Sequence, residues 1–327
     1  MPNQHHSGAA ARHGALPSAD SPSADSPSAD LPSADLPSVG FVGVGNMGQP
    51  MALNVLNSGR ACAVQVYGRS SQRLERVVAA GAVACPTPRR LAEASDVIFS
   101  VLPDLPELET LLHGETGILA GIDSPTLLVI SSTSSPDGVR ELAARLTRDT
   151  QGLLRAMDAP VSGGPEGAAS ATLSIMVGAA ADDFALAESV LSAMGTPVLL
   201  GPLGSGQVAK ACNQLIVAST MLALGEASVI AERCGLDLAT LLPLLQGGYA
   251  GGRLLDTRVQ RLIDKDYSVL AAAKYLLKDL GFAAAEAQNT GTIAPQLAAT
   301  RAAYIALVER GFGDQDISVT QAYVSSL

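Results

Sequence analysis

From Val39 onward, short apolar runs alternate along the chain with longer segments that mix apolar and polar residues. Runs such as VGFVGVG, CAVQVYG, DVIFSVLP and TLLVISST have the length and composition of buried strands. The segments between them, such as QPMALNVLNSG, SQRLERVVAAG and PDGVRELAARLTRD, have the length of helices. This alternation is typical of parallel strands joined by crossover helices, so it predicts an α/β domain over residues 39–202.

The pattern changes after about Pro202. TLSIMVGA and PVLLGPLG are the last runs that read as strands, and nearly everything from there to Leu327 can be drawn as helix. The first of these helices is long and apolar, from about Ser205 to Cys234. We therefore expect an all-α C-terminal domain over residues 203–327, linked to the α/β domain by this long helix.

The first 38 residues carry a different signal. They contain a five-residue repeat with a proline in each copy, as in SPSADSPSADLPSAD, which offers almost nothing to bury. A segment of this composition cannot offset the entropy lost on ordering. We expect residues 1–38 to be a disordered tail, with docking onto a partner as the alternative.

Charge and cysteine content narrow the class of ligand. The net charge of -10 argues against nucleic acid or an anionic membrane surface as partner. Cys62, Cys85, Cys212 and Cys234 lie far apart and form no Cys-x-x-Cys pair, so no disulfide framework is indicated. The longest uncharged apolar stretch, Ala211–Gly225, is too short and too polar for a membrane span. We expect a cytoplasmic protein that binds small molecules, with no nucleic-acid or membrane partner.

A glycine motif follows the first predicted strand: Gly43-Val44-Gly45-Asn46-Met47-Gly48. In a chain with 32 glycines, the motif alone leaves an ordinary turn open as the alternative. Between a strand and a helix, the first glycine permits a tight turn, the second admits a pyrophosphate and the third lets helix and strand approach. The helix N-terminus adds free N–H groups for phosphates. This context favours a Rossmann dinucleotide-binding domain.

Several catalytic arrangements are missing. His5, His6 and His13 lie in the predicted tail, and His113 fits a solvated helix end. A histidine-based dehydrogenase or a histidine-ligated metal site is therefore not expected. No tyrosine is followed four residues later by lysine, and no Gly-Lys-Ser/Thr occurs, which argues against a short-chain dehydrogenase pair and a P-loop.

Lys210 stands out because lysine is scarce. The chain has 21 lysines and arginines together, and only Lys210, Lys265, Lys274 and Lys278 are lysines. Lys210 lies early in the long apolar helix, where Asn213 shares its face. An unremarkable surface lysine is the alternative. A lysine among apolar residues in an arginine-rich chain nevertheless favours a titratable amine, because desolvation lowers its pKa toward the range of a general acid.

Four motifs occur in the order FVGVGNMGQPMALNVLNSG, DAPVSGGPEGAASATLSIMVG, GSGQVAKACNQ and LLKDLGFAAAEA. Together they resemble the β-hydroxyacid dehydrogenases, which include 3-hydroxyisobutyrate dehydrogenase and tartronate semialdehyde reductase. The resemblance covers Val39 to about Tyr323. It implies hydride transfer between a nicotinamide cofactor and a small β-hydroxy acid or its semialdehyde. We also expect a homodimer or homotetramer.

The resemblance implies a role for each motif residue. Lys210 matches the catalytic lysine, and Asn213 matches a neighbouring substrate contact. Ser162, Gly163 and Gly164 match the substrate loop, where successive N–H groups and a hydroxyl can hold a carboxylate, with an ordinary turn as the alternative. The positions matched to the cofactor side are Gly43, Gly45, Asn46, Met47, Gly48, Leu102, Pro103, Thr133 and Lys278.

Some positions differ from the family's usual residue or have an alternative role. For Lys278 the alternative is a solvated helix face, and Asp279 is expected to be structural. Ala171 stands where the family often has glycine, and Ile130 where it often has aspartate. Ala271 stands where it commonly has a phenylalanine against the substrate, which implies a wider pocket and leaves the substrate undetermined.

The stretch after the second strand favours NADP over NAD. An NAD site places an acidic residue about twenty residues beyond the glycine turn to bind the ribose hydroxyls. Gly68 stands at that distance from Gly48. Arg69 and Ser70 follow and suit a ribose 2′-phosphate, with Arg73 as a second contact. The alternative is that Arg69 is only a solvated residue before the next helix.

Two other functions stay open. An imine reductase shares this architecture but commonly lacks the lysine, so Lys210 speaks against it and Ala271 for it. A non-catalytic cofactor-binding protein is the second, because a fold does not establish an activity. An intact lysine and carboxylate nest argue against this second alternative.

Overall fold

The computed structural model describes residues 36–327, so nearly all of the predicted tail lies outside the described residues. Within this part the chain begins with a sheet of nine strands. The strands are β1 Ser38–Val42, β2 Ala63–Tyr67, β3 Val83–Ala84, β4 Val97–Ser100, β5 Thr126–Ile130, β6 Leu154–Asp158, β7 Val161–Ser162, β8 Leu173–Gly178 and β9 Gly195–Gly201.

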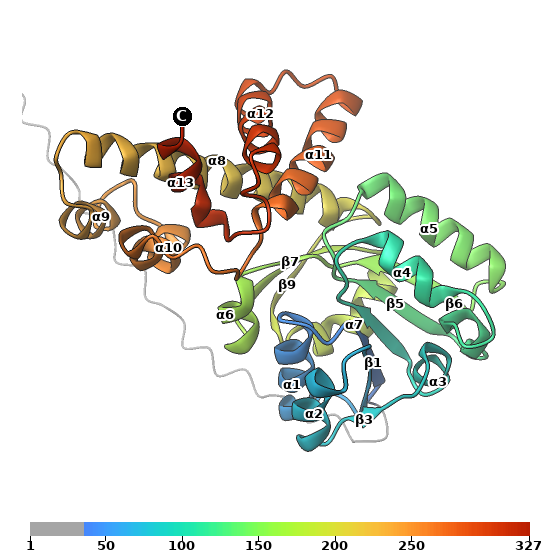
Figure 1. The fold of residues 1–327 in the computed structure, drawn as a ribbon. Coiled ribbons are helices and arrows are strands. Elements are labelled where there is room, and N and C mark those ends of the chain that lie inside the picture. The colour runs from blue at the N-terminus through green and yellow to red at the C-terminus, as the bar shows by residue number, and fades with distance from the viewer. Residues whose placement is uncertain (1–35) are drawn as a thin grey trace, which may run out of the picture. The chain divides into compact units, whose positions relative to one another are not determined.

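Helices join the strands and then make up the rest of the chain (Figure 1). Those between strands are α1 Gly48–Ser58, α2 Ser71–Ala79, α3 Pro88–Ala92, α4 Leu105–Leu112, α5 Pro136–Asp149, α6 Gly164–Ala169 and α7 Ala181–Leu191. Those after the sheet are α8 Ser205–Arg233, α9 Leu238–Gln246, α10 Arg253–Asp264, α11 Ala273–Asn289, α12 Pro295–Glu309 and α13 Thr320–Ser325. Short 3-10 turns cover Ile118–Gly121 and Ile317–Val319.

The strand order is β3-β2-β1-β4-β5-β6-β8-β7, and β9 pairs with β8. Strands β1 to β6 are all parallel, whereas β8 runs antiparallel to β6 and β7. The order reverses between β1 and β4, which is where an open parallel sheet binds its ligand. The predicted fold class, a Rossmann domain followed by a helical region, is confirmed.

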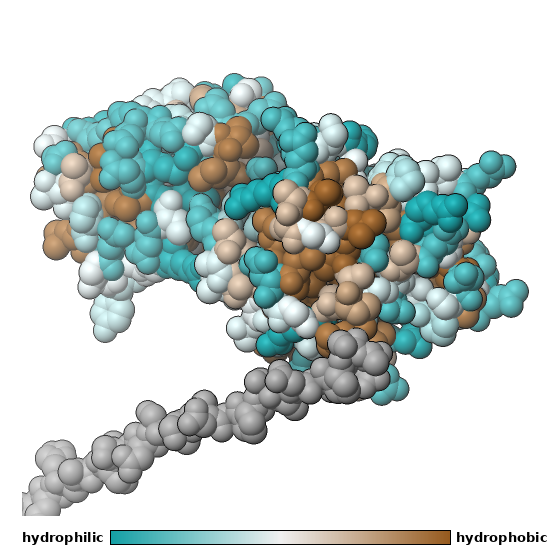
Figure 2. Space-filling view, turned by 90° about the horizontal axis from the view of Figure 1, so that it is seen from below, coloured by the Kyte–Doolittle hydropathy of each residue, from teal (hydrophilic) through white to brown (hydrophobic). Residues whose placement is uncertain are grey.

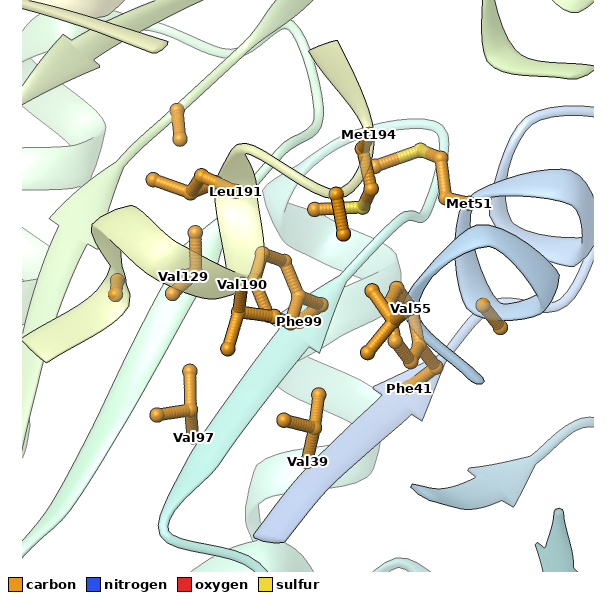
Figure 3. Packing of buried hydrophobic residues seen from close by; sticks show 14 of the residues in the cluster. Val39, Phe41, Met51, Val55, Val97, Phe99, Val129, Val190, Leu191 and Met194 are labelled. Carbon is orange, nitrogen blue, oxygen red and sulfur yellow. The ribbon is translucent and has the colours of Figure 1, made fainter. Parts of the chain in front are cut away.

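The side chains of the central strands pack into two hydrophobic cores, one on each face of the sheet, because successive residues of a strand point to opposite faces. Val39 and Phe41 pack against α1 and α7, and Phe41 stacks on Phe99 with ring centroids 5.0 Å apart (Figure 3). Val42 and Ile98 point to the other face and pack with apolar residues of α3, α4 and α5. Both faces are covered, which explains why these strands are apolar throughout.

Helix α8 begins beside the sheet and becomes the centre of a third core. Its Ala218 and Met221 are fully buried and belong to one cluster with Leu280 of α11, Tyr304 of α12 and Tyr323 of α13. In the described part of the chain α8 is also long and apolar enough to cross a membrane by length and composition, with 44% of its most apolar window buried. A core helix passes the same test, so the expected absence of a membrane partner stays a prediction.

Some apolar side chains remain on the surface. Figure 2 shows hydrophobic residues gathered on part of the face seen from below, with hydrophilic residues over most of the rest. Strand β9 contributes large exposed side chains: Val198 is 50% exposed and Leu200 48%. The strand was predicted from its apolar run, but no local pattern indicated that these side chains would be exposed.

Candidate active site

A cavity of about 1060 Å³ lies at the carboxyl ends of the parallel strands, between the sheet and helices α8, α10 and α11. Every residue predicted for the cofactor side lines it: Gly43, Gly45, Asn46, Met47, Gly48, Arg69, Ser70, Leu102, Pro103, Thr133 and Lys278. Ser162, Gly163, Gly164 and Lys210 line it as well. The structure therefore gathers motifs far apart in the sequence around one space.

The three glycines of the first turn have distinct constraints. Gly43 has a φ of +94°, and a Cβ there would collide with the carbonyl of Val101. A Cβ on Gly48 would collide with the carbonyl of Gly43. A Cβ on Gly45, by contrast, would have only the Arg73 guanidinium within 4 Å, at 3.7 Å. Gly45 therefore leaves its backbone open to the cavity, beside the N-terminus of α1, which fits a bound pyrophosphate.

The carboxyl end of β2 carries cationic and hydroxyl groups. Arg69, Ser70 and Arg73 line the cavity there, and no acidic residue lies among its lining residues between Tyr67 and Leu74. Ser70 is the N-cap residue of α2, but its hydroxyl makes no capping bond. Gln49 anchors this corner to α1, because its Nε2 donates to the carbonyl of Arg73 at 2.8 Å.

Lys278 of α11 connects the helical part to two loops of the sheet. Its Nζ donates to the carbonyl of Thr133 at 2.5 Å and to that of Pro103 at 3.2 Å. It also lies 3.4 Å from Oδ1 of Asp279 and 5.0 Å from the ring centroid of Phe282. Its side chain is 26% exposed, so it is not a freely solvated residue.

The predicted substrate loop turns sharply from β7 into α6. Gly163 and Gly164 have φ values of +136° and +66°, which favour glycine. The hydroxyl of Ser162 donates to Oδ1 of Asn213 at 3.4 Å. Asn213 itself is not among the lining residues, so it contacts the site through this hydrogen bond to Ser162.

Lys210 is 7% exposed in the wall of the cavity, one helical turn before Gln214. Burial lowers the pKa of Lys210 to about 8; the negative charge of Asp279 opposes this, and the positive charge of Lys278 adds to it. Gln214 joins the two halves of the site, because it accepts a bond from Asn213 at 2.9 Å and donates to Asp279 at 2.6 Å. An amine with this pKa exchanges protons near neutral pH.

Asp279, for which a structural role was expected, also lines the cavity. It is 3% exposed, and its Oδ1 has no hydrogen-bond partner in the described structure. Burial raises its pKa, while Lys278, Gln214 and Lys210 oppose the rise. The negative charge of Asp279 raises the pKa of Lys210 and attracts the nearby ammonium of Lys278. The sequence offered one signal, an aspartate directly after a lysine and flanked by the apolar runs YLL and LGFAAA.

Two buried polar residues missed in the sequence hold the start of α8. Asp158, at the end of β6, accepts from the N–H groups of Gly204 at 2.6 Å and Gln207 at 2.7 Å. The Gln207 side chain accepts from the N–H of Ser134 and donates to the carbonyl of Ser132 at 2.8 Å. These bonds fix the helix that carries Lys210 to the loop that carries Thr133. An aspartate ending an apolar strand was the available signal, since a buried carboxylate needs donors.

The described residues contain no group of three or more histidine, cysteine, aspartate or glutamate side chains placed to hold a metal ion.

The fold and site define the class of protein: an oxidoreductase with a Rossmann dinucleotide-binding domain and a helical region that completes its cavity. Residues 38–204 match the NAD-binding domain of 6-phosphogluconate dehydrogenase, and residues 204–323 match the NAD-binding region of NADP-dependent 3-hydroxyisobutyrate dehydrogenase. The chain belongs to the β-hydroxyacid dehydrogenase family and is an NAD(P)-dependent enzyme that acts on CH–OH groups.

Relatives with assigned names agree with this family. The chain is 33% identical over 284 residues to the NAD-dependent L-serine dehydrogenase of Pseudomonas aeruginosa, covering 84% of this chain and 94% of that one. It is 35% identical over 254 residues to the 2-hydroxy-3-oxopropionate reductase of Escherichia coli, covering 77% and 85%.

Solved structures resemble it over most of their length. A 3-hydroxyisobutyrate dehydrogenase from Salmonella typhimurium has a TM-score of 0.80 at 25% identity, covering 87% of this chain and 99% of that chain. A 3-hydroxyisobutyrate dehydrogenase from Mycobacterium tuberculosis has a TM-score of 0.74 at 28% identity, covering 88% and 99%. An imine reductase from Myxococcus stipitatus has a TM-score of 0.58 at 18% identity, a likeness of fold alone.

Proposed function

We propose that this enzyme transfers a hydride between NADP(H) and a small β-hydroxy acid or its semialdehyde, with Lys210 as the general acid and base. One observation carries the proposal. A buried lysine with a pKa lowered to about 8 lines the same cavity as the substrate loop and the glycine turn. A general acid is most effective when its pKa is near the working pH.

Different residues of the cavity have different roles in the proposed hydride transfer. A bound nicotinamide supplies or accepts the hydride at its C4. The N–H groups and hydroxyl of the Ser162 loop hold the substrate carboxylate, which fixes the distance of the reacting carbon. In reduction Lys210 donates a proton to the developing alkoxide and stabilises its charge; in oxidation it accepts that proton. Asn213 orients Ser162 through the bond between their side chains.

The cofactor end supports NADP. Arg69 and Ser70 face the cavity after β2, where an NAD site carries an acidic side chain, and Arg73 lies within reach of the same region. A guanidinium pairs with a phosphate through two parallel bonds, which favours the 2′-phosphate. One solved structure of the same fold, at 23% identity, was determined with NADP+.

Replacement of Lys210 tests the proposal. Lys210→Met and Lys210→Arg should each lower kcat by roughly 10²–10⁴-fold, because neither side chain exchanges a proton near pH 8. NADPH affinity, measured by fluorescence titration, should stay within about twofold, a free-energy change of about 0.4 kcal/mol. Lys274→Met is the matched control, since Lys274 is half exposed and pairs with Asp314 away from the cavity lining. Near-normal turnover by Lys210→Arg would contradict the role of Lys210.

An imine reductase is the second candidate, and Ala271 favours it. Ala271 lines the cavity and leaves room for a bulkier substrate than a phenylalanine would. Lys210 and the substrate loop argue for the hydroxy acid instead. Side-by-side assays with a cyclic imine and with hydroxy acids, each with NADP(H) and NAD(H), separate the two.

A further inference from the structure

Helix α10 places two arginines in the cavity wall that the proposed reaction does not use. Arg253, the first residue of α10, and Arg258 both line the cavity together with Thr257 between them. They belong to the helical part of the chain, whereas Arg69 and Arg73 follow β2 of the sheet.

Arg258 is buried without a full set of partners. The residue is 5% exposed, its Nη1 donates only to the carbonyl of the adjacent Thr257 at 3.1 Å, and its Nε makes no hydrogen bond in the described structure. The nearest carboxylate oxygen is Oδ1 of Asp316, 3.6 Å from Nε. Arg261 competes for that oxygen at 3.7 Å but has Asp266 as a second partner at 3.1 Å. Arg258 has no such second carboxylate.

Asp316 has little capacity left for Arg258. Its oxygens already accept from the N–H of Ala271 at 3.0 Å and from the N–H and hydroxyl of Ser318 at 3.1 and 2.7 Å. A buried guanidinium that is left with unused donors favours an anion in the space it faces.

Arg253 extends the cationic surface toward the substrate loop. Its Nη2 donates to the hydroxyl of Thr172 at 3.2 Å and lies 3.6 Å from where a Cβ on Gly167 would be. No carboxylate of the described residues lies within ion-pair distance of it. The side chain of Arg253 is exposed, and its guanidinium is held near the substrate loop by a neutral partner.

Ala271 lines the same cavity as the two arginines and Lys210, together with the apolar residues Leu254, Leu270 and Tyr275. Six cationic and three acidic side chains line the whole cavity, although the chain carries a net charge of -10. Glu166, in the first turn of α6, is one of the three acidic lining residues. Such a cavity concentrates substrates with more than one negative charge.

We propose that Arg253 and Arg258 bind a second, distal anionic group of the substrate. The preferred substrates are then hydroxy acids, or their semialdehydes, that carry an additional carboxylate or phosphonate group two or three carbons from the first. The inference rests on the proposed function, since the Ser162 loop holds the first carboxylate. Apolar walls accommodate the carbons between the two acids, and the guanidinium forks recognise the planar or tetrahedral oxyanion.

The experiment compares three substrates that share the reacting end: 3-hydroxyisobutyrate, 2-(hydroxymethyl)glutarate and 2-(hydroxymethyl)pentanoate. The last two have the same carbon chain length, but only the glutarate has a terminal carboxylate. We expect kcat/KM for the glutarate to exceed both others by at least about tenfold, a difference of about 1.4 kcal/mol in transition-state binding. A terminal phosphonate analogue distinguishes a carboxylate site from a phosphonate site.

Arg253→Gln identifies the group responsible. It should raise KM for the glutarate by about tenfold or more and leave the pentanoate unchanged, because the lost interaction is made only with the distal acid. Arg258→Gln should act in the same direction. Because Arg258 is buried beside Asp316, its replacement also affects the stability of the fold, so Arg253→Gln is the decisive variant. Arg301→Gln, exposed on α12, is the matched control.

Equal kcat/KM for the glutarate and the pentanoate would overturn the inference while leaving the proposed function intact. The same conclusion would follow if Arg253→Gln raised KM equally for both acids, since Arg253 would then bind the first carboxylate. Failure to turn over any hydroxy acid would contradict the proposed function and the inference with it.

Discussion

The proposed reaction depends on one ammonium group, that of Lys210, which burial makes easier to deprotonate. Lys210 has its pKa lowered to about 8 by burial, while the charge of Asp279 holds it from falling further. The protonated form decreases as pH rises through about 8. Reduction needs that form, so its rate should fall with rising pH, and oxidation, which needs the neutral amine, should gain rate over the same range.

Asp279→Asn tests this balance. Removing the negative charge removes the effect that raises the pKa of Lys210, so the pH–rate limb for reduction should move to lower pH. Asparagine keeps an oxygen that can accept from Gln214, which leaves the hydrogen bond at 2.6 Å possible. Asp314→Asn, on an 85% exposed side chain, is the control and should leave the profile in place. A profile that does not move in Asp279→Asn would separate Asp279 from the titration of Lys210.

The proposed preference for NADP over NAD rests most directly on Arg69. We expect kcat/KM for NADPH to exceed that for NADH by about tenfold, or about 1.4 kcal/mol. Arg69→Ala should remove this difference by weakening NADPH alone, because NADH has no 2′-phosphate to lose. Arg76→Ala, exposed near the end of α2 and not part of the cavity lining, is the matched control. An equal loss for both cofactors would assign Arg69 to the shared part of the dinucleotide.

At the level of elements, much of the fold follows from the sequence. Strands β1, β2, β4 and β5 could be predicted from their apolar runs, because both faces of a covered parallel sheet are buried. Strand β3 covers only Val83–Ala84, and both residues are exposed, so it leaves no apolar run to detect. The antiparallel turn of β7 onto β8 depends on pairing partners that local patterns do not specify.

The same distinction applies to the site. The glycine turn, the Ser162 loop and Lys210 belong to motifs with local spacing, and all of them meet in one cavity. Arg253 and Arg258 lie on an amphipathic helix whose orientation depends on packing against distant helices. In the sequence, an arginine that lines a cavity looks the same as an arginine on a solvated helix face. Their role could be inferred only from the structure.

The junction of β1 and α1 gives a prediction about elements in contact. Gly48→Ala would push a methyl group into the carbonyl of Gly43, so we expect a loss of about 1–3 kcal/mol of stability and weaker cofactor binding. Gly281→Ala is the matched control on α11, because its Cβ would have no neighbour within 4 Å. It should be neutral or stabilise the protein by up to about 1 kcal/mol. Urea unfolding and NADPH titration measure both effects, and unchanged binding in Gly48→Ala would show that the turn adapts.

Over the whole described molecule, the cavity joins the sheet to the helical part. Its lining runs from the glycine turn through Lys210 to α10 and α11, and Lys278 donates hydrogen bonds across to the loops after β4 and β5. A ligand in this cavity contacts both parts at once. Its binding free energy therefore stabilises both against unfolding, rather than one alone.

This coupling predicts how the cofactor changes thermal unfolding. NADPH at one hundred times its Kd should add about 2.7 kcal/mol to the free energy of unfolding and raise the Tm of a single cooperative transition. The sheet and the helical part should unfold together, since the α8 helix belongs to the packing of both. Scanning calorimetry with and without NADPH measures this, and NADH at the same concentration should give a smaller rise because it lacks the 2′-phosphate. Two separate transitions, with only one raised by NADPH, would mean that the cofactor is held by the sheet alone and that the helical part contributes little to its binding.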